Sequence, residues 1–149
     1  MDALEFHHPL NSNSEIYLRF LGRAVGLKRI GVTIARVPPG KESFIYHAHQ
    51  NEEEWIYILS GRGMAEIGDR LYEVEPGDFM GFGLPQQPHH LRNPFNQDLV
   101  YLMGGEAGCL DVAVFPRLGK RVIRDSESAY IFDESALQLL WSSKQSTEE

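Results

Sequence analysis

Two histidines separated by one residue, with glutamates shortly after them, have the spacing in this sequence that most clearly suggests chemistry. His47 and His49 precede a polar segment that ends at Glu54, and the apolar residues 55–59 follow directly. In a strand, side chains at positions i and i+2 project from the same face, so both imidazoles can point toward one spot. If the chain reverses across residues 50–53, Glu54 can face them from the next strand. Imidazole nitrogens and one carboxylate oxygen are a common ligand set for Zn, Fe, Mn, Ni or Cu.

Many short strands separated by turns are predicted to carry these side chains. β-Branched and aromatic residues occur in short runs bounded by Gly, Pro, Asn and Asp, with almost no helical periodicity. The predicted strands cover residues 28–37, 43–49, 55–59, 64–67, 70–74, 79–82, 89–92, 98–103, 110–115, 121–124 and 129–132. Gly104-Gly105-Glu106 is expected to be a turn. This succession indicates an all-β barrel or sandwich.

The two ends of the chain are predicted to add little to the barrel. Residues 1–15 are interpreted as a solvated N-terminal arm. Near the other end, Asp133 can cap a short helix through about Trp141, with apolar residues on one side. Residues 142–149 are typical of a frayed polar tail.

Length and composition narrow the class of protein. The 149 residues, 42% of them hydrophobic, suit one domain over residues 1–149 with a core at about 28–116. The formal net charge of −7 argues against nucleic acid as a partner, because that needs a basic face. The apolar runs are five residues at most, so no membrane span is expected, and the first twenty residues lack the apolar core of a signal peptide. Cys109 is the only cysteine, which is compatible with a reducing, cytoplasmic location.

Two segments resemble the two motifs of the cupin superfamily. The first motif is matched by Gly40, His47, His49, Glu54 and Gly61. The second is matched by Gly77, Pro85, His89 and Asn93. The resemblance covers roughly residues 32–103, and His-x-His occurs once. It implies a single-domain (monocupin) protein with an all-β, cupin-type double-stranded β-helix, or jelly-roll barrel, which a short C-terminal helix can follow.

The sequence departs from the cupin pattern at two places. Gly40 lies one residue further from the His-x-His pair than in the commonest pattern, and the Pro-x-Gly turn is replaced by Pro85-Gln86-Gln87. The backbone of that second loop must therefore differ from the family's usual one, which leaves two neighbouring histidines as candidates for the last metal ligand.

His89 and His90 compete for this ligand position. His89 keeps the three-residue spacing to Asn93, whereas His90 keeps the count from the loop proline. Adjacent strand residues face opposite sides, so only one can point inward. We choose His89, because this also turns Leu91 toward the core and leaves His90 and Arg92 outward. The metal ligands implied by the resemblance are then His47, His49, Glu54 and His89.

Such a site would hold one divalent metal ion (Zn, Fe, Mn or Ni). Three imidazoles and one carboxylate around an octahedral ion leave two positions for an oxygen-rich substrate, or for a substrate and O₂, whereas tetrahedral Zn would be closed. The family includes dioxygenases, decarboxylases, sugar-phosphate isomerases and epimerases, and non-enzymatic binding proteins. The resemblance thus implies a small metalloenzyme of the sugar-phosphate isomerase/epimerase or dioxygenase type, or alternatively a non-enzymatic small-molecule-binding or sensing module.

Further lining residues are hard to identify from the sequence. Four residues could line a pocket beside the metal: Arg36, Tyr57, Glu66 and Tyr101. Each is at least as often a surface or packing residue, so no catalytic acid or base is named.

Strand parity also predicts how the chain assembles. If Glu54 points into the barrel, Ile56 and Ile58 point inward with it. The outward residues are then Trp55, Tyr57 and Leu59. Burying a residue of this kind is worth ~1.5–3 kcal/mol, so we expect a homodimer that covers this stripe. The alternative is a monomer whose C-terminal helix lies over it.

Overall fold

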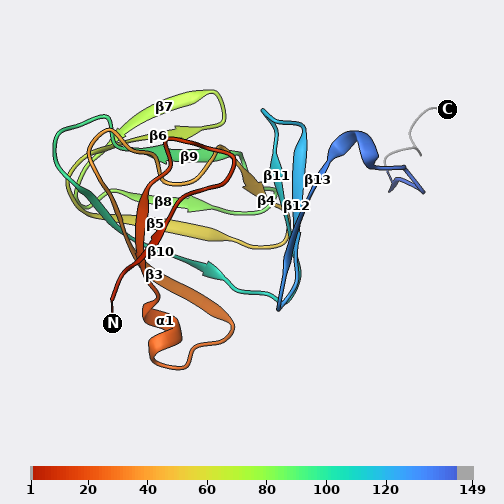
Figure 1. Cartoon of the computed structure of the whole chain (residues 1–149), viewed down its shortest axis with the longest axis horizontal. Helices are drawn as coiled ribbons and strands as arrows, with labels where there is room; N and C mark the ends of the chain where they lie inside the picture. Colours follow the sequence, from red (N-terminus) through yellow and green to blue (C-terminus); the bar gives the residue numbers. More distant parts are fainter. Residues whose placement is uncertain (1, 144–149) are drawn as a thin grey trace.

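Short strands make up almost all the regular structure in residues 2–143, the part of the chain that this computed structural model describes (Figure 1). The strands are β1 (Leu4–Phe6), β2 (Ile16–Arg19), β3 (Ile30–Val37), β4 (Ala48–His49), β5 (Glu54–Ser60), β6 (Gly63–Ile67), β7 (Arg70–Val74), β8 (Phe79–Phe82), β9 (His89–Arg92), β10 (Leu99–Glu106), β11 (Asp111–Phe115), β12 (Lys120–Arg124) and β13 (Ala129–Asp133). A short helix, α1 (Leu21–Ala24), connects β2 to β3, and a 3-10 turn, Glu134–Ala136, follows β13. The predicted all-β class is confirmed.

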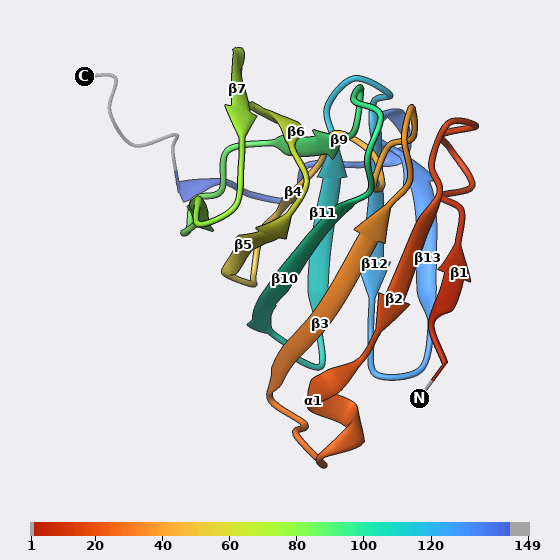
Figure 2. The ribbon, with the colours of Figure 1, turned by 90° about the vertical axis from the view of Figure 1, so that its left-hand side faces the viewer.

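The strands of the described residues form three antiparallel sheets. Their strand orders are β1-β2-β3-β10-β5-β8, β13-β12-β11-β4 and β7-β6-β9. Figure 2 shows β10, β3, β2 and β1 side by side across one face, with β11, β12 and β13 behind them. Isolated bridges join Glu42 to Arg92 and His47 to His89. The non-sequential strand order and the two facing layers are those of the jelly-roll barrel that was predicted.

The core lies between these layers and is built by alternate residues of the central strands. On β10, Leu99 and Tyr101 are buried, and they pair in register with Val37 and Ala35 of β3, which are buried too. Each large apolar side chain removed from water contributes ~1.5–3 kcal/mol. The packed strands β3, β10 and β5 therefore form a stable part of the sheet that supports the residues of the site.

Strand β5 has the parity that the sequence predicts. Ile58 is fully buried and Ile56 packs against the core, whereas Tyr57 and Leu59 are 40% and 42% exposed. Trp55 is half-buried because its ring stacks on Phe79 of β8, with the two ring centroids 6.1 Å apart. This parity turns Glu54, the first residue of β5, toward the barrel interior.

The N-terminal residues are not the solvated arm that was expected. Residues 4–6 form β1, which pairs with β2 at the edge of the largest sheet. Beyond it, the Asn11 side-chain amide donates to the Phe44 carbonyl oxygen at 2.7 Å, and Ser14 bridges to Glu42. The polar residues of this segment are used in hydrogen bonds to the barrel, a role that its composition does not reveal.

The chain also continues as a strand where glycines suggested a turn. Gly104, Gly105 and Glu106 form the last part of β10. A Cβ atom on Gly104 would lie 2.5 Å from the Trp55 ring, and one on Gly105 would lie 2.4 Å from the Glu53 carbonyl oxygen. These glycines therefore allow close approach to β5 and do not end the strand.

The C-terminal helix expected through Trp141 is shorter in the structure. Only the 3-10 turn Glu134–Ala136 forms, and Asp133 pairs with the Lys120 ammonium at 2.5 Å without capping a helix. Leu140 and Trp141 are 93% and 75% exposed. An apolar face without a packing partner does not support so short a helix. Most of the expected polar tail, residues 144–149, lies outside the described residues.

No helix within residues 2–143 is long and apolar enough to cross a membrane.

Candidate metal centre

The backbone places His47 and His89 directly opposite each other. Most of the segment predicted as a strand over residues 43–49 is irregular, with β4 limited to Ala48–His49. It nevertheless runs beside β9, because the His47 N–H donates to the His89 carbonyl at 3.1 Å and the His89 N–H donates back at 2.8 Å. Residues paired in this way project side chains to the same face. The two ring centroids are accordingly 4.8 Å apart.

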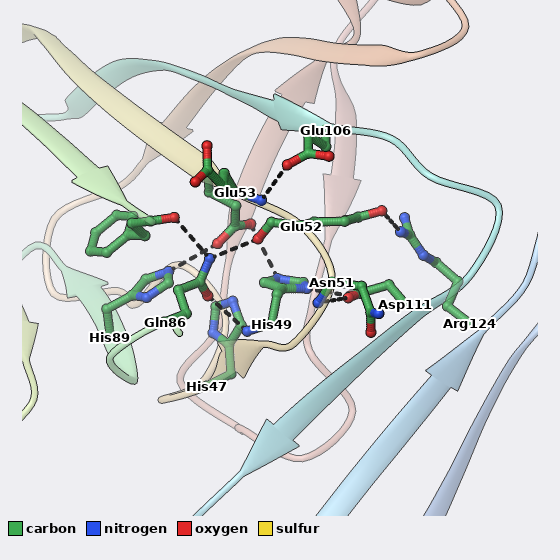
Figure 3. A network of polar contacts seen from close by, with 12 residues as sticks. His47, His49, Asn51, Glu52, Glu53, Gln86, His89, Glu106, Asp111 and Arg124 are labelled. Atoms are coloured by element: carbon green, nitrogen blue, oxygen red, sulfur yellow. Dashed lines mark hydrogen bonds and ion pairs between the residues drawn. The ribbon is translucent and has the colours of Figure 1, made fainter. Parts of the chain in front are cut away.

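His49, the last residue of β4, and Glu54, the first residue of β5, complete the cluster. His49 lies two residues after His47, and the centroids of these rings are 5.0 Å apart. Its Nε2 lies 3.1 Å from Glu54 Oε1, and His89 Nε2 lies 3.2 Å from Glu54 Oε2. His47, His49 and Glu54 each offer a ligand atom within 4.8 Å of the others. The structure therefore brings all four predicted side chains together, and Figure 3 shows the three imidazoles turned toward one another.

Each imidazole of the cluster is held from behind through Nδ1. His47 Nδ1 lies 2.6 Å from the Ile45 carbonyl oxygen, and His89 Nδ1 lies 3.1 Å from the Gln87 carbonyl oxygen. His49 Nδ1 lies 2.5 Å from Asp111 Oδ2. Carbonyl and carboxylate oxygens only accept, so each Nδ1 carries the proton. In the neutral ring, Nε2 then presents a lone pair to the shared space.

This arrangement fits a divalent metal ion. When these rings are neutral, the Nε2 lone pairs of His49 and His89 lie against the Glu54 carboxylate, where acceptor faces acceptor, and Glu54 Oε2 is buried without a hydrogen-bond partner. A buried polar atom without a partner is costly, and a cation among these atoms would satisfy all of them. Metal-binding histidines also commonly donate their other N–H to a carboxylate or carbonyl, as all three do here.

The electrostatics of the metal-free cluster agree with a need for positive charge. Burial lowers the pKa of His49, but the Glu54 and Asp111 carboxylates outweigh it and raise that pKa to about 9. Burial lowers the pKa of His47 to about 3. Burial would raise the pKa of Glu54, but its contacts with His49 and His89 hold it well below its usual range. Without a metal, an imidazolium at His49 thus supplies the charge that the carboxylates require.

His90, the alternative fourth ligand, faces the other side of β9. Its Nε2 lies 2.9 Å from Glu42 Oε1, away from the cluster, while Leu91 packs into the core as predicted. His90 therefore points away from the cluster as expected, but it is only 8% exposed. The strand does alternate as predicted, but Glu42 and the N-terminal segment cover its outer face.

Three residues that the sequence did not single out position the ligands. Asp111 is 2% exposed and also accepts from the Asn51 N–H at 3.2 Å. Gln86 accepts from the His49 N–H at 2.7 Å. The Phe82 ring stacks on His89, with centroids 3.7 Å apart. Gln86 lies where the loop departs from the Pro-x-Gly pattern, which was its only signal; Asp111, at the start of a late strand, had none.

A second group of possible ligands, His49, Glu52 and Asp111, is already committed to other contacts. Glu52 is buried, forms an ion pair with Arg124 and accepts from the Gly108 N–H at 3.0 Å. Asp111 accepts hydrogen bonds from His49 Nδ1 and from the Asn51 backbone N–H. We therefore place the candidate centre on the Glu54 side of His49.

The cluster opens into a cavity of about 690 Å³ inside the barrel. Tyr101 lines it, as predicted for a pocket residue, and burial raises the pKa of Tyr101. The other three candidates lie elsewhere: Arg36 pairs with Asp98, Glu66 pairs with Arg117, and Tyr57 is on the outer face. These three were predicted from residue type alone, and strand parity turns them outward.

Comparison with known proteins gives a consistent result. The model of the cupin domain matches residues 33–105. The solved structure of a "putative sugar phosphate isomerase" from Acidithiobacillus ferrooxidans is 34% identical, with a TM-score of 0.90 over 95% of this chain and 91% of that chain. A sugar phosphate isomerase from a cupin superfamily of Silicibacter pomeroyi has a TM-score of 0.82 over 93% of this chain and 89% of that chain, at 21% identity, which shows the shared fold.

One curated relative also matches in sequence. It is an uncharacterized protein of Methanocaldococcus jannaschii, 37% identical over 68 residues, which are 46% of this chain and 53% of that protein. The chain thus spans about half the length of this relative. The name of this relative gives neither a family nor an activity.

Proposed function

Since this chain belongs to the cupin superfamily, we propose that it is a metal-dependent enzyme that interconverts isomers of a phosphorylated sugar. The observation that carries the proposal is a cluster of three imidazoles and one carboxylate at a large cavity, in a chain that aligns along 95% of its length with the Acidithiobacillus protein. The cavity volume of about 690 Å³ lies in the ordinary range of ligand pockets.

In this proposal one divalent ion is held by His47, His49, Glu54 and His89. Their Nε2 and carboxylate oxygen atoms are the donors that Fe, Mn, Ni and Zn accept, and an ion that keeps open positions suits the chemistry better than a closed tetrahedral Zn. The support is geometric: the donors converge, and Glu54 Oε2 has no other partner. The metal is expected at ~2.0–2.2 Å from each donor atom.

Aldose–ketose interconversion moves a proton between two neighbouring carbon atoms, each of which carries an oxygen. A bound divalent ion would supply Lewis-acid polarisation of those oxygens and a template for them. Asp111 keeps His49 in the tautomer whose Nε2 is free to bind, and Phe82 fixes the plane of the His89 ring. Tyr101 and Met103 line the interior wall and keep water away from the substrate.

The proposal is tested by incubating the purified protein with a panel of aldose and ketose phosphates and following isomer formation by NMR, with O₂ uptake recorded in parallel. We expect isomerisation without O₂ consumption, loss of activity on chelation and recovery with a divalent metal. O₂ uptake with a diol substrate would favour a dioxygenase. Tight binding without turnover of any sugar would instead indicate a binding or sensing module.

A matched pair of variants makes the test specific. Glu54→Gln should abolish turnover because it removes the anionic donor from the cluster. Glu66→Gln makes the same chemical change on the surface, where Glu66 pairs with Arg117, and should leave turnover unchanged. Equal activity of both variants would show that the cluster is not the active site.

We further propose that residues 1–149 form one domain that acts as a homodimer in the cytoplasm. The outer face of the barrel exposes Tyr57, Leu59 and Phe79, and the C-terminal segment exposes Leu140 and Trp141. Large exposed apolar surfaces of this kind usually mark an interface. The exposed, unpaired Cys109 is compatible with a reducing compartment.

A further inference from the structure

The cavity has a second end, away from the metal ligands. Residues of α1 and of the segment that follows it, including Arg23 and Lys28, line this end from one side. Gly108 and Ser126 line it from the other, in the connections before β11 and before β13. Figures 1 and 2 both show α1 and the β12–β13 turn at the same end of the molecule. A ligand in the cavity would therefore lie between this end and the metal centre.

The two cations on α1 and its following segment have no acidic partner. Within residues 2–143, neither Arg23 nor Lys28 forms an ion pair. The Arg23 guanidinium carbon lies 4.6 Å from the centroid of the Phe20 ring, which holds it by a cation–π contact at the cavity wall. In a chain of net charge −7, two unpaired cations on one cavity wall favour an anionic ligand.

Apart from Glu54, the acidic side chains that line the cavity are engaged in contacts within the protein. The Glu106 carboxylate accepts from the Glu53 N–H at 3.1 Å. The Asp125 carboxylate accepts from the N–H groups of Glu127 and Ser128, at 2.8 and 2.7 Å. Glu52 pairs with Arg124. These carboxylates are directed at backbone N–H groups or at Arg124, and within residues 2–143 none of them pairs with Arg23 or Lys28.

The strand register gives the distance from Glu54 to Gly31, a cavity-lining residue near the start of β3. Glu54 of β5 pairs with Gly105 of β10, and Gly105 pairs with Gly31 of β3. Neighbouring strands lie about 4.8 Å apart, so Gly31 is about 10 Å from Glu54. Lys28 lies three residues before Gly31. The separation of about 10 Å between Glu54 and Gly31 is comparable with the length of an open-chain pentose or hexose whose last carbon carries a phosphate.

Gly31 leaves the path between the two ends open. It has the parity of Thr33 and Ala35, whose side chains are buried inside the barrel. A Cβ atom on Gly31 would have only the Gly105 carbonyl oxygen within 4 Å, at 3.8 Å, and Gly31 is not in the left-handed region. Neither backbone conformation nor close packing therefore demands glycine here, whereas a side chain would project into the cavity.

We propose that Arg23 and Lys28 bind the terminal phosphate of the substrate, so that the oxygens at its other end meet the metal centre. A guanidinium offers paired donors to phosphate oxygens, and an ammonium adds a second positive charge against the dianion. This inference rests on the proposed function for the identity of the ligand. We call Arg23 and Lys28 together the anchor. Their contacts with the phosphate explain why the protein would bind a phosphorylated sugar in preference to the free sugar.

The test measures the affinity of the metal-loaded protein for ribose 5-phosphate and glucose 6-phosphate, and for ribose and glucose, by calorimetry. The double variant Arg23→Gln, Lys28→Gln is compared with Arg29→Gln, which removes a charge from the same segment at a residue that does not line the cavity. We expect the double variant to lose about tenfold or more in affinity for a phosphorylated sugar, with its metal content unchanged, and Arg29→Gln to match the parent protein.

The outcomes separate this inference from the proposed function. Selective binding of a phosphorylated sugar that depends on Arg23 and Lys28, but without turnover, supports the anchor and contradicts the isomerase. Turnover that is insensitive to both substitutions supports the isomerase and overturns the anchor. Equal affinity of the parent protein for sugars with and without phosphate also overturns the anchor.

Discussion

Replacing Asp111 by Asn is expected to weaken metal binding strongly while leaving the barrel folded. Asp111 is almost fully buried, its Oδ2 accepts the His49 Nδ1 proton at 2.5 Å, and its Oδ1 accepts from the Asn51 N–H. An amide has one acceptor oxygen, so it can serve only one of these two donors and turns an N–H group toward the other. The negative charge that makes His49 a better donor to the metal is lost as well.

The size of this effect follows from the position of Asp111. Loss of a carboxylate that supports a metal-binding histidine typically costs 10- to 100-fold in metal affinity, and a short, buried contact belongs near the upper end. We therefore expect a loss of about 30- to 100-fold, or about 2 to 2.7 kcal/mol. Competition with a metal-indicator chelator measures this affinity directly. Circular dichroism checks that the variant is folded.

Asp98→Asn is the matched control for this substitution. Asp98 is exposed, and it forms an ion pair at 3.3 Å with Arg36, which is not a residue of the cluster. The affinity of the Asp98→Asn variant for metal should stay within about twofold of the parent value, because exposed ion pairs contribute little to stability. An Asp111→Asn protein that bound metal as tightly as this control would refute the tautomer argument on which the metal centre rests.

Metal affinity should rise with pH up to about 9. Burial lowers the pKa of His49, but the Glu54 and Asp111 carboxylates outweigh it and raise that pKa to about 9 when no metal is bound. His49 Nε2 must lose its proton to bind a cation, so binding is favoured as the pH rises toward this value. Calorimetry at pH 7 in buffers of different ionisation enthalpy should show about one proton released per ion, and no release would contradict this. Gly31→Val, a substitution compatible with a strand, should keep its metal but bind a phosphorylated sugar about tenfold more weakly, since its side chain enters the cavity; unchanged affinity would show that the ligand does not pass Gly31. Light scattering at micromolar concentration should give twice the 16.9 kDa of one chain, and a mass of one chain would refute the homodimer.

The parts of the fold that were predictable from the sequence depend on local patterns. Alternation placed Ile56 and Ile58 inside, and it put His89 and Leu91 on one face of β9, because the period of a strand is fixed at two. The hairpin of β6 and β7 was likewise predictable, since strands were expected over residues 64–67 and 70–74; Gly68 between them adopts a positive φ of 59°. Signals of this kind depend on neighbours in sequence and survive without knowledge of the tertiary structure.

What could not be predicted depends on contacts between distant segments. Asp111 approaches His49 across 62 residues, and nothing in its own neighbourhood marks it. Gly104 and Gly105 were predicted to form a turn, because the close approach of Trp55 and Glu53 to them cannot be inferred from the sequence. The N-terminal segment was predicted to be solvated, because the hydrogen bond from the Asn11 amide to the Phe44 carbonyl oxygen cannot be inferred from the sequence. In each case the deciding partner comes from tertiary structure.

The proposed metal centre is tested most directly by mass-spectrometric metal analysis of protein purified without added metal or chelator. His89→Ala and His90→Ala are analysed beside the parent chain. These neighbouring residues are both buried, but only His89 faces Glu54, whereas His90 faces Glu42. We expect about one divalent ion per chain in the parent protein and in His90→Ala, and almost none in folded His89→Ala. No metal in the parent protein, or its loss in His90→Ala and retention in His89→Ala, would contradict the metal centre described above.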